Sequence, residues 1–256
     1  MPDRPEFVQS LARGIAVIRA FSAENPRLTL SDVARETGLS RAAARRFLIT
    51  LEELGYVAND GRLFSLRPSV LQIGYSYLSS LTLAQISQGH LERLAQELHE
   101  SCSASVLDND EIVYVARAST NRIMTINLSV GTRLPAYCTS MGRVLLAALS
   151  DDELDTYLAD TTFRALTSRT ITDATALREE IQRVRVQGWC LLDQELEEGV
   201  RSIAFPLHDA DQKVVAAANA SAHGARVALD EMRERYVPAL RECAAQIDRD
   251  LAGARY

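Results

Sequence analysis

Arg41, Arg45 and Arg46 lie in the first half of a predicted helix, with Ala42 and Ala43 between the first two of them. A guanidinium can fork onto the edge of a guanine base or pair with a phosphate, and small alanines let a helix approach a surface closely. Residues of these types at this spacing could contact DNA. Taken alone, however, three arginines on a helix more often form a solvated basic face, so the neighbouring elements must decide.

The elements in front of that helix favour DNA binding. Thr29 and Asp32 have the spacing of a capping box, which begins a short helix, and Gly38 ends it because glycine takes the left-handed conformation at little steric cost. Ser40 can then cap the arginine-bearing helix, which we expect to run to about Leu54. Two helices joined by so tight a turn predict a helix-turn-helix, whose second helix enters the major groove.

A helix is predicted before this motif, over 10–21, and a hairpin after it. The helix carries an apolar stripe that we expect to face the core: Leu11, Ile15, Ile18 and Phe21. Two short alternating runs, 56–58 and 63–66, flank an Asp-Gly pair that is typical of a hairpin turn. The hairpin would form a wing with Arg62 at its tip, near the DNA backbone. A surface arginine without a specific role explains Arg62 nearly as well.

Charge is distributed unevenly along the chain. The net charge of −6 argues against a protein coated in nucleic-acid-binding surface. Residues 1–67, however, hold ten arginines against eight acidic residues, a net of +2, while the remainder holds 18 basic against 26 acidic residues, a net of −8. This asymmetry predicts a small front module that meets a polyanion and a larger rear module that does not.

The rear half alternates strands with helices. Strands are predicted over 103–108, 111–119, 122–129, 189–194, 201–209 and 213–222. Helices are predicted to begin near His90, Ser140, Asp152, Ala174 and Arg226. This order indicates a mainly antiparallel sheet with helices on its faces, an α+β domain in a two-domain α/β protein.

The rear half shows no sequence pattern of an enzyme. It has no GxSxG, GxGxxG, P-loop or HExxH, its histidines are solitary, and the four cysteines of the chain form no CxxC. We therefore expect no catalytic residues, no metal and no other cofactor. Catalytic groups can converge only in space, so a hydrolase or isomerase domain fused to a DNA-binding head is the alternative. A purely architectural DNA-binding protein is a third possibility, but it would give the rear half no function.

Several stretches resemble the IclR-type bacterial transcriptional regulators: SLARGIAVIRAF, LTLSDVARETGLSRAAARRFLITLEELGYV, LPAYCTSMGRVLLAAL, GWCLLDQELEEGVRSIAFPL and AAANASA. The resemblance covers nearly the whole chain and is closest to the subgroup that governs aromatic-acid catabolism by the β-ketoadipate route. It implies a winged helix-turn-helix domain, a linker helix and a GAF-like effector-binding domain. It also implies an operator of double-stranded DNA and an effector such as protocatechuate or a β-ketoadipate-like acid.

The region after the wing is too apolar for a solvent-exposed helix: it includes Val70, Leu71, Ile73, Tyr77, Leu78 and Leu81. The resemblance makes it a linker helix that pairs with another subunit, within a homodimer or a tetramer built from two dimers. Dimerisation is reasonable because one recognition helix covers too few base pairs. Packing on its own domain is the alternative. The expected domains are 1–67 for DNA binding, 68–88 for the linker and 89–256 for the effector.

Three segments of the rear half are candidates for an effector pocket: the loop 131–140 with the first turn of the helix that follows it, the segment 190–201, and the strand end that carries Asn219 and Ser221. Free amides at the start of the helix near Ser140 would suit a carboxylate ligand. The candidate contacts are Arg133, Tyr137, Ser140, Met141, Cys190, Asp193, Arg201, Asn219 and Ser221. Structural roles compete with this interpretation: Ser140 can cap a helix, Arg201 can pair with Glu198, and Asn219 can bond across the sheet.

The DNA contacts divide into two groups. We expect Ser40, Arg41, Ala42, Ala43 and Arg45 to read the groove, and Gln9, Arg13, Arg46 and Arg62 to hold phosphates. No apolar run approaches the roughly 20 residues that cross a bilayer, and the first ten residues are polar. We therefore expect a cytoplasmic protein with no membrane contact. Whether it also contacts RNA polymerase is left open by the sequence.

Overall fold

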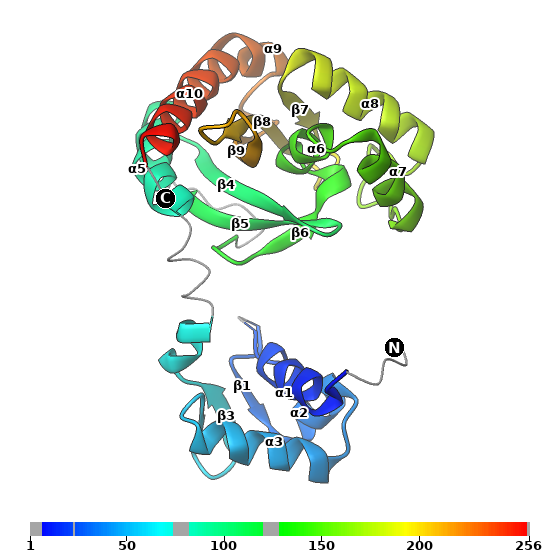
Figure 1. The fold of residues 1–256 in the computed structure, drawn as a ribbon, viewed down its shortest axis with the longest axis vertical. Helices are drawn as coiled ribbons and strands as arrows, with labels where there is room; N and C mark the ends of the chain where they lie inside the picture. The colour runs from blue at the N-terminus through cyan, green and yellow to red at the C-terminus, as the bar shows by residue number, and fades with distance from the viewer. Residues whose placement is uncertain (1–6, 23, 74–81, 120–127, 255–256) are drawn as a thin grey trace. The chain divides into compact units, whose positions relative to one another are not determined.

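The computed structural model describes residues 7–22, 24–73, 82–119 and 128–254. The chain divides into two compact units, 1–80 and 81–256 (Figure 1). Within the described ranges, no helix is long and apolar enough to span a membrane.

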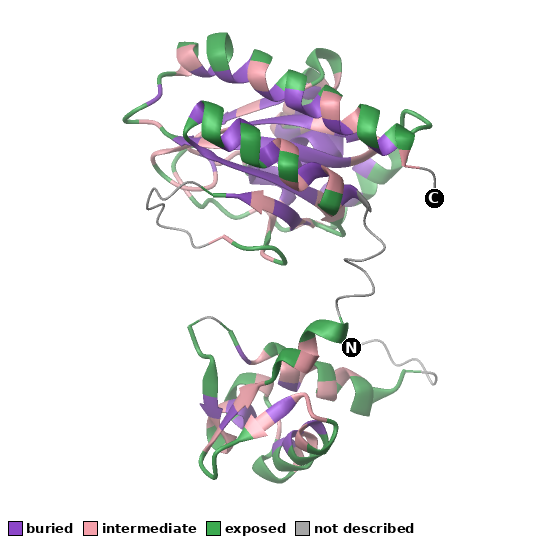
Figure 2. Cartoon of the chain, turned by 90° about the vertical axis from the view of Figure 1, so that its left-hand side faces the viewer, coloured by how far each residue is buried: buried purple, intermediate pink, exposed green. Residues whose placement is uncertain are grey.

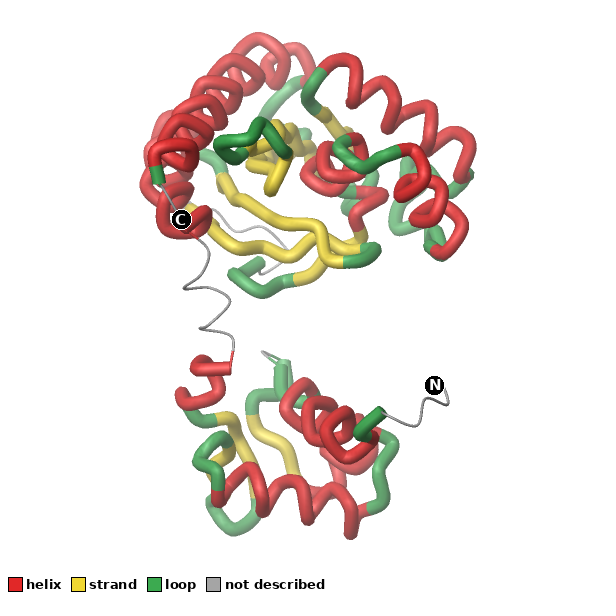
Figure 3. Tube along the Cα trace, viewed as in Figure 1, coloured by secondary structure: helices red, strands yellow, loops and turns green. Residues whose placement is uncertain are grey.

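Among its described residues, the front unit combines three complete helices with a small sheet (Figure 3). The helices are α1 (Gln9–Arg19), α2 (Leu30–Thr37) and α3 (Arg41–Glu53), and the strands are β1 (Arg27–Thr29), β2 (Val57–Asn59) and β3 (Leu63–Leu66). The strands pair antiparallel in the order β1-β3-β2, and a 3-10 turn, Pro68–Val70, follows them. This confirms the predicted winged helix-turn-helix. The strand β1 was not predicted, because its last residue, Thr29, has the sequence signature of a helix cap.

The predicted helix boundaries of the front unit are confirmed by hydrogen bonds. The Thr29 hydroxyl accepts a bond from the Asp32 amide, and the Asp32 carboxylate accepts one from the Thr29 amide. Gly38 ends α2 with φ of 67°, a conformation that side-chain-bearing residues avoid. The Ser40 hydroxyl accepts from the Ala43 amide at 3.2 Å and so caps α3. These caps fix the sharp angle between α2 and α3.

The predicted core stripe of α1 is wrong at two of its four positions. Leu11 and Ile15 are 63% and 49% exposed, whereas Val17 is fully buried and Phe21 is 9% exposed. The face that packs inward also includes Gly14, which lies against the ring of Phe47. A glycine does not count as apolar in a sequence pattern. The pattern therefore favoured the neighbouring face of the helix, which carries Leu11 and Ile15.

The rear unit is built on a six-stranded antiparallel sheet in the order β6-β5-β4-β9-β8-β7. The strands are β4 (Ser101–Asp108), β5 (Glu111–Ala118), β6 (Arg133–Pro135), β7 (Cys190–Asp193), β8 (Val200–His208) and β9 (Val214–His223). This confirms the predicted α+β domain. Of the predicted strands, 122–129 falls almost wholly outside the described residues. The short strand β6 was not predicted and lies in a segment that we expected to be a loop.

Helices cover both faces of the sheet (Figure 1). On one face α5 (Thr82–Leu98) packs beside α10 (Val237–Gly253), which follows the short α9 (Leu229–Glu231) and a π-helical turn, Met232–Tyr236. On the other face lie α6 (Ser140–Ala147), α7 (Asp151–Asp160) and α8 (Ala174–Gln187). A separate buried apolar cluster fills the space on each side of the sheet, so the strands are mostly buried and the helices expose their outer faces (Figure 2).

The expected linker region, 68–88, is described only in part, since 74–81 lies outside the described residues. The helix expected to begin near His90 begins at Thr82 instead. Leu83 belongs to the buried cluster of the rear unit and is 4% exposed. The last residues of the expected linker therefore belong to the core of the rear unit.

Candidate functional site

The front unit presents an exposed basic surface at the start of α3. Arg41, Arg45 and Arg46 are exposed and form no ion pair with any described residue, while Ala44 and Leu48 on the opposite face are fully buried. Ser40 and Ala42 are also exposed, and Ala43 is half-buried. The helix is thus anchored by one face and offers guanidinium donors, with little bulk between them, on the other.

Three further predicted DNA contacts are exposed in the same unit. Gln9 and Arg13 lie on α1, and Arg62 lies in the wing turn between β2 and β3. None of the three forms an ion pair with a described residue, in contrast to Arg27, which pairs with Asp60. The Asp60 carboxylate also accepts bonds from the amides of Arg62 and Leu63, and these bonds lower its pKa. Asp60 therefore holds the wing turn, and the Arg62 side chain is left free to contact DNA.

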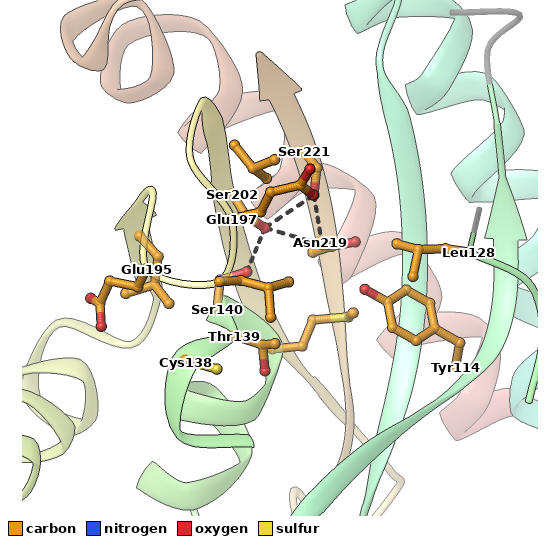
Figure 4. Close-up of a pocket in the computed structure, with 14 residues that line it drawn as sticks. Tyr114, Leu128, Cys138, Thr139, Ser140, Glu195, Glu197, Ser202, Asn219 and Ser221 are labelled. Atoms are coloured by element: carbon orange, nitrogen blue, oxygen red, sulfur yellow. Dashed lines mark hydrogen bonds between the residues drawn. The ribbon is translucent and has the colours of Figure 1, made fainter. Parts of the chain in front are cut away.

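The rear unit contains a pocket between the N-terminal end of α6, the strands β8 and β9, and the turn that joins β7 to β8 (Figure 4). It encloses about 510 Å³, including space open to solvent. Four of the nine predicted effector contacts line it: Ser140, Met141, Asn219 and Ser221. The pocket lining comes from segments far apart in the sequence.

A cluster of three serines and Asn219 forms one wall. The Ser140 and Ser202 hydroxyl oxygens are 2.6 Å apart, and the Asn219 amide nitrogen donates to Ser202 at 3.1 Å and to Ser221 at 3.0 Å. Ser221 also donates to Ser202 at 3.2 Å. The hairpin register places Ser202 directly opposite Ser221, which is why these hydroxyls meet. The Asn219 amide oxygen has no hydrogen-bond partner among the described residues.

The start of α6 offers free backbone donors to the pocket. The Thr139 hydroxyl accepts from the Gly142 amide, but the amides of Ser140 and Met141 have no acceptor among the described residues. A side-chain carbon at Gly142 would lie 2.1 Å from the Ala136 carbonyl oxygen, so only glycine allows this close packing. Free amides and the positive end of the helix dipole suit an anionic group.

The hydroxyl of Tyr114 adds a side-chain donor on the β5 side of the pocket. Burial raises the pKa of Tyr114 to about 12, so the phenol stays protonated near neutral pH. It forms no hydrogen bond with any described residue. A carboxylate or carbonyl oxygen of a ligand could therefore accept from it.

Two of the three glutamates in the turn between β7 and β8 line the pocket. The Glu195 carboxylate points away from the serine cluster and accepts a bond of 2.5 Å from Arg143, a residue of α6 that is 1% exposed (Figure 4). Burial raises the pKa of Glu195, and the positive charge of Arg143 opposes that shift. Glu197 also lines the pocket, and its Oε2 atom is buried without a partner among the described residues.

Five predicted effector contacts do not line the pocket, and each has a structural partner instead. Arg133 pairs with Glu111 at 2.6 Å and Asp108 at 2.7 Å on the outside of the sheet. The Tyr137 hydroxyl bonds to the backbone of residue 164, and Cys190 is fully buried in the apolar cluster. The last two, Asp193 and Arg201, pair with each other at 2.7 Å, so Arg201 does not take the expected partner Glu198.

Ten lining residues were not among the nine predicted contacts, although seven of the ten lie in the predicted segments 131–140 and 190–201. The ten are Tyr114, Leu128, Cys138, Thr139, Leu192, Glu195, Leu196, Glu197, Val200 and Ser202. Most of them are apolar or lie on strands whose neighbours are distant in sequence. The sequence did contain one indication of Ser202: it lies on the predicted strand just before the strand that carries Ser221, and the two strands form a hairpin. Pairing those strands before choosing residues would have found Ser202.

Both units match known protein families and known structures. The model of the IclR helix-turn-helix domain matches residues 10–61, and that of the bacterial transcriptional regulator IclR C-terminal region matches residues 75–249. The Pca regulon regulatory protein of Pseudomonas putida is 48% identical over 250 residues, which cover 97% of this chain and 86% of that protein.

Two solved structures extend the match to three dimensions. A protein of Rhodococcus sp. RHA1, described as a transcriptional regulator, is 55% identical with a TM-score of 0.87, over 97% of this chain and all of that one. An IclR homologue of Microbacterium hydrocarbonoxydans in complex with 4-hydroxybenzoate is 25% identical with a TM-score of 0.85, over 96% of this chain and all of that one. These matches place the chain among regulators and not among enzymes. The chain belongs to the IclR family of bacterial transcriptional regulators.

Proposed function

We propose that this regulator controls transcription in response to an aromatic acid of the protocatechuate or 4-hydroxybenzoate type, or to a β-ketoadipate-like acid. The observation that carries the proposal is the pocket in which the free amides of Ser140 and Met141 meet the cluster of hydroxyls around Ser202. Such a site suits the carboxylate of a small acid. The names of the Pseudomonas relative and of the 4-hydroxybenzoate complex support this class of effector.

On the DNA side, we infer that Ser40, Arg41, Ala42, Ala43 and Arg45 read base edges in the major groove. Gln9, Arg13, Arg46 and Arg62 would hold the backbone phosphates. The exposure of all these side chains except the half-buried Ala43 supports this division, as does the absence of ion pairs to these arginines within the described residues. We place the protein in the cytoplasm, where its DNA target lies.

We infer that the protein acts as a homodimer or as a pair of dimers, with the region 68–88 linking DNA-binding and effector-binding domains of 1–67 and 89–256. Exposed apolar residues of α1 and of the segment just before it support association. Leu11 and Ile15 lie one turn apart on α1 and are 63% and 49% exposed, and Phe7, before the helix, is 46% exposed. An effector can shift such an assembly only by binding one of its arrangements more tightly.

The test combines ligand and DNA binding on the purified full-length protein. Thermal unfolding is measured with 4-hydroxybenzoate, protocatechuate and β-ketoadipate, and DNA from upstream of its own gene is titrated with and without the stabilising ligand. We expect a saturable rise in Tm for at least one acid and a change in DNA affinity with that acid. Stabilisation by none of them would refute the effector class and leave the family assignment intact.

A further inference from the structure

The orientation of the Asn219 amide is determined by the hydrogens available around it. The four contacts among Asn219, Ser140, Ser202 and Ser221 each need one hydrogen. If the amide nitrogen faces the serines, it supplies two of the four hydrogens. Ser221 supplies the third to Ser202, and the fourth lies between Ser140 and Ser202. With the oxygen toward the serines, the hydroxyls of Ser202 and Ser221 would both point at it, and their mutual contact would have no hydrogen.

The amide oxygen of Asn219 is therefore the atom left over for the pocket. Asn219 is 5% exposed, and its Oδ1 has no partner among the described residues. Figure 4 shows the side chain between the serines and the wall formed by Tyr114 and Leu128. A buried acceptor without a donor is unfavourable, so a ligand that brings a hydrogen to this atom gains affinity.

Glu197 provides a second acceptor of the same kind. Its Oε2 atom is buried and unpartnered among the described residues, and its side chain lines the same pocket. An ionised carboxylate can only accept hydrogen bonds. Its backbone is held in the turn, because the Glu197 carbonyl oxygen accepts from the Val200 amide at 3.1 Å. Two segments of the rear unit thus each place a buried, unsatisfied acceptor on a residue that lines the pocket.

The pocket lining offers a second carboxylate a neutral donor, the Tyr114 hydroxyl, but no positive charge. No lysine, arginine or histidine is among the described residues that line the pocket, and Arg143 is already engaged by Glu195. One carboxylate of a ligand can use the amides at the start of α6. A second carboxylate would meet Glu197 without a cation to neutralise it.

We propose that Asn219 and Glu197 make the pocket selective for acids that carry a hydroxyl group as hydrogen-bond donor, and against simple diacids. The proposal rests on the proposed function, since it assumes that the ligand is a small acid in this pocket. It separates the candidate effectors: protocatechuate and 4-hydroxybenzoate bring a phenolic hydroxyl, whereas a β-ketoadipate-like acid brings two carboxylates and an additional acceptor.

The test compares acids that differ in one group. Dissociation constants of 4-hydroxybenzoate, benzoate and adipate are measured by calorimetry on the full-length wild-type protein. We expect 4-hydroxybenzoate to bind about 10- to 100-fold more tightly than benzoate, because a site built to accept a hydroxyl rejects the analogue that lacks it. Adipate should bind more weakly than either.

Variants then assign the preference to residues. Asn219→Leu and Glu197→Met remove an acceptor while keeping the side-chain size, and each should reduce the ratio of the benzoate to the 4-hydroxybenzoate dissociation constant at least severalfold. Glu198→Met is the matched control, since Glu198 is exposed in the same turn and does not line the pocket. Its ratio should equal that of the wild type. Thermal unfolding identifies any variant that fails to fold.

The wild-type comparison decides the proposal even if both variants misfold. Equal binding of benzoate and 4-hydroxybenzoate, or tighter binding of adipate, would overturn the selectivity and leave an acid-responsive regulator. Unchanged ratios in two folded variants would overturn the assignment to Asn219 and Glu197. Binding of none of the acids would overturn both this proposal and the effector class, and operator binding would show whether the DNA-binding function remains.

Discussion

Arg143 is 1% exposed, so water cannot solvate its charge and neighbouring groups of the rear unit must compensate it. It donates to the Glu195 carboxylate at 2.5 Å and to the Tyr137 carbonyl oxygen at 2.9 Å. The same Glu195 carboxylate accepts from the Ile171 amide at 3.3 Å. One ion pair thus joins α6, the segment before α8 and the turn between β7 and β8.

Replacing Glu195 by alanine should destabilise the rear unit strongly. The change would leave the buried Arg143 guanidinium with only the more distant Glu180 carboxylate, at 4.0 Å, as counter-charge, and removing one partner of a buried pair costs about 3–5 kcal/mol. Chemical denaturation followed by far-UV circular dichroism measures the loss. Glu198→Ala, at an exposed position of the same turn, should change the free energy of unfolding by less than about 0.5 kcal/mol. Equal effects of the two variants would contradict the role given to the pair.

In the front unit, Arg41→Ala and Arg46→Ala should weaken DNA binding in different ways. Losing a bidentate base contact at Arg41 should cost about 1–3 kcal/mol on the operator and much less on unrelated DNA. Losing a phosphate contact at Arg46 should weaken all sequences alike and reduce the salt dependence by about one unit of slope. Titrations at several salt concentrations distinguish the two. A uniform loss for Arg41→Ala would make it a phosphate contact.

Among the elements, α6 is held in place by its closeness to the preceding turn. The ideal position of a side-chain carbon at Gly142 lies 2.1 Å from the Ala136 carbonyl oxygen and 2.4 Å from the Ala136 Cα atom. This contact sets where the amides of Ser140 and Met141 point. The donor end of the pocket is therefore determined by backbone packing.

Gly142→Ala should force α6 away from Ala136. Overpacking of this kind costs about 1–3 kcal/mol, and the shifted amides should also weaken effector binding. The control is Gly253→Ala, because an added side-chain carbon there meets nothing within 4 Å. That variant should be neutral or slightly stabilising. Thermal unfolding with and without 4-hydroxybenzoate measures both effects, and full ligand affinity in Gly142→Ala would refute the positional role of this contact.

Elements specified by local chemistry could be predicted from the sequence, and those specified by distant contacts could not. The caps at Thr29, Gly38 and Ser40 depend on neighbours within three residues, and the structure confirms them. The inward face of α1 depends on how Gly14 meets a ring on α3, which no local pattern reveals. Likewise, Ser140 could be predicted to line the pocket because it begins a helix with free amides. Tyr114 could not be predicted, because it lies on a strand that is distant in sequence from the other predicted segments.

At the scale of the whole molecule, apolar side chains of α1 and of the segment just before it are exposed to water. Phe7, Leu11 and Ile15 expose about half or more of their surface, although the front unit has its own complete core. A second copy of the chain would remove them from water, and two recognition helices would lengthen the DNA site that is read. This supports association through the front unit as well as through the expected linker.

The double variant Leu11→Glu with Ile15→Glu should therefore shift the protein toward smaller assemblies. Placing charges in an apolar contact between subunits is unfavourable, whereas the same residues are tolerated at an exposed site of a monomer. Sedimentation velocity over a range of concentrations measures the shift. Val186→Glu, at a residue that is 89% exposed, is the control. An unchanged distribution of species in the double variant would show that α1 takes no part in association.

Two neighbouring side chains of the turn that joins β7 to β8 have different roles: Glu195 pairs with Arg143, while Glu197 lines the pocket. A designer of metabolite biosensors could therefore diversify positions 197 and 198 and keep both Glu195 and Leu196, which packs against the apolar cluster, constant. New inducers would then be sought without loosening the scaffold, because the randomised positions carry none of the ion pairs described above.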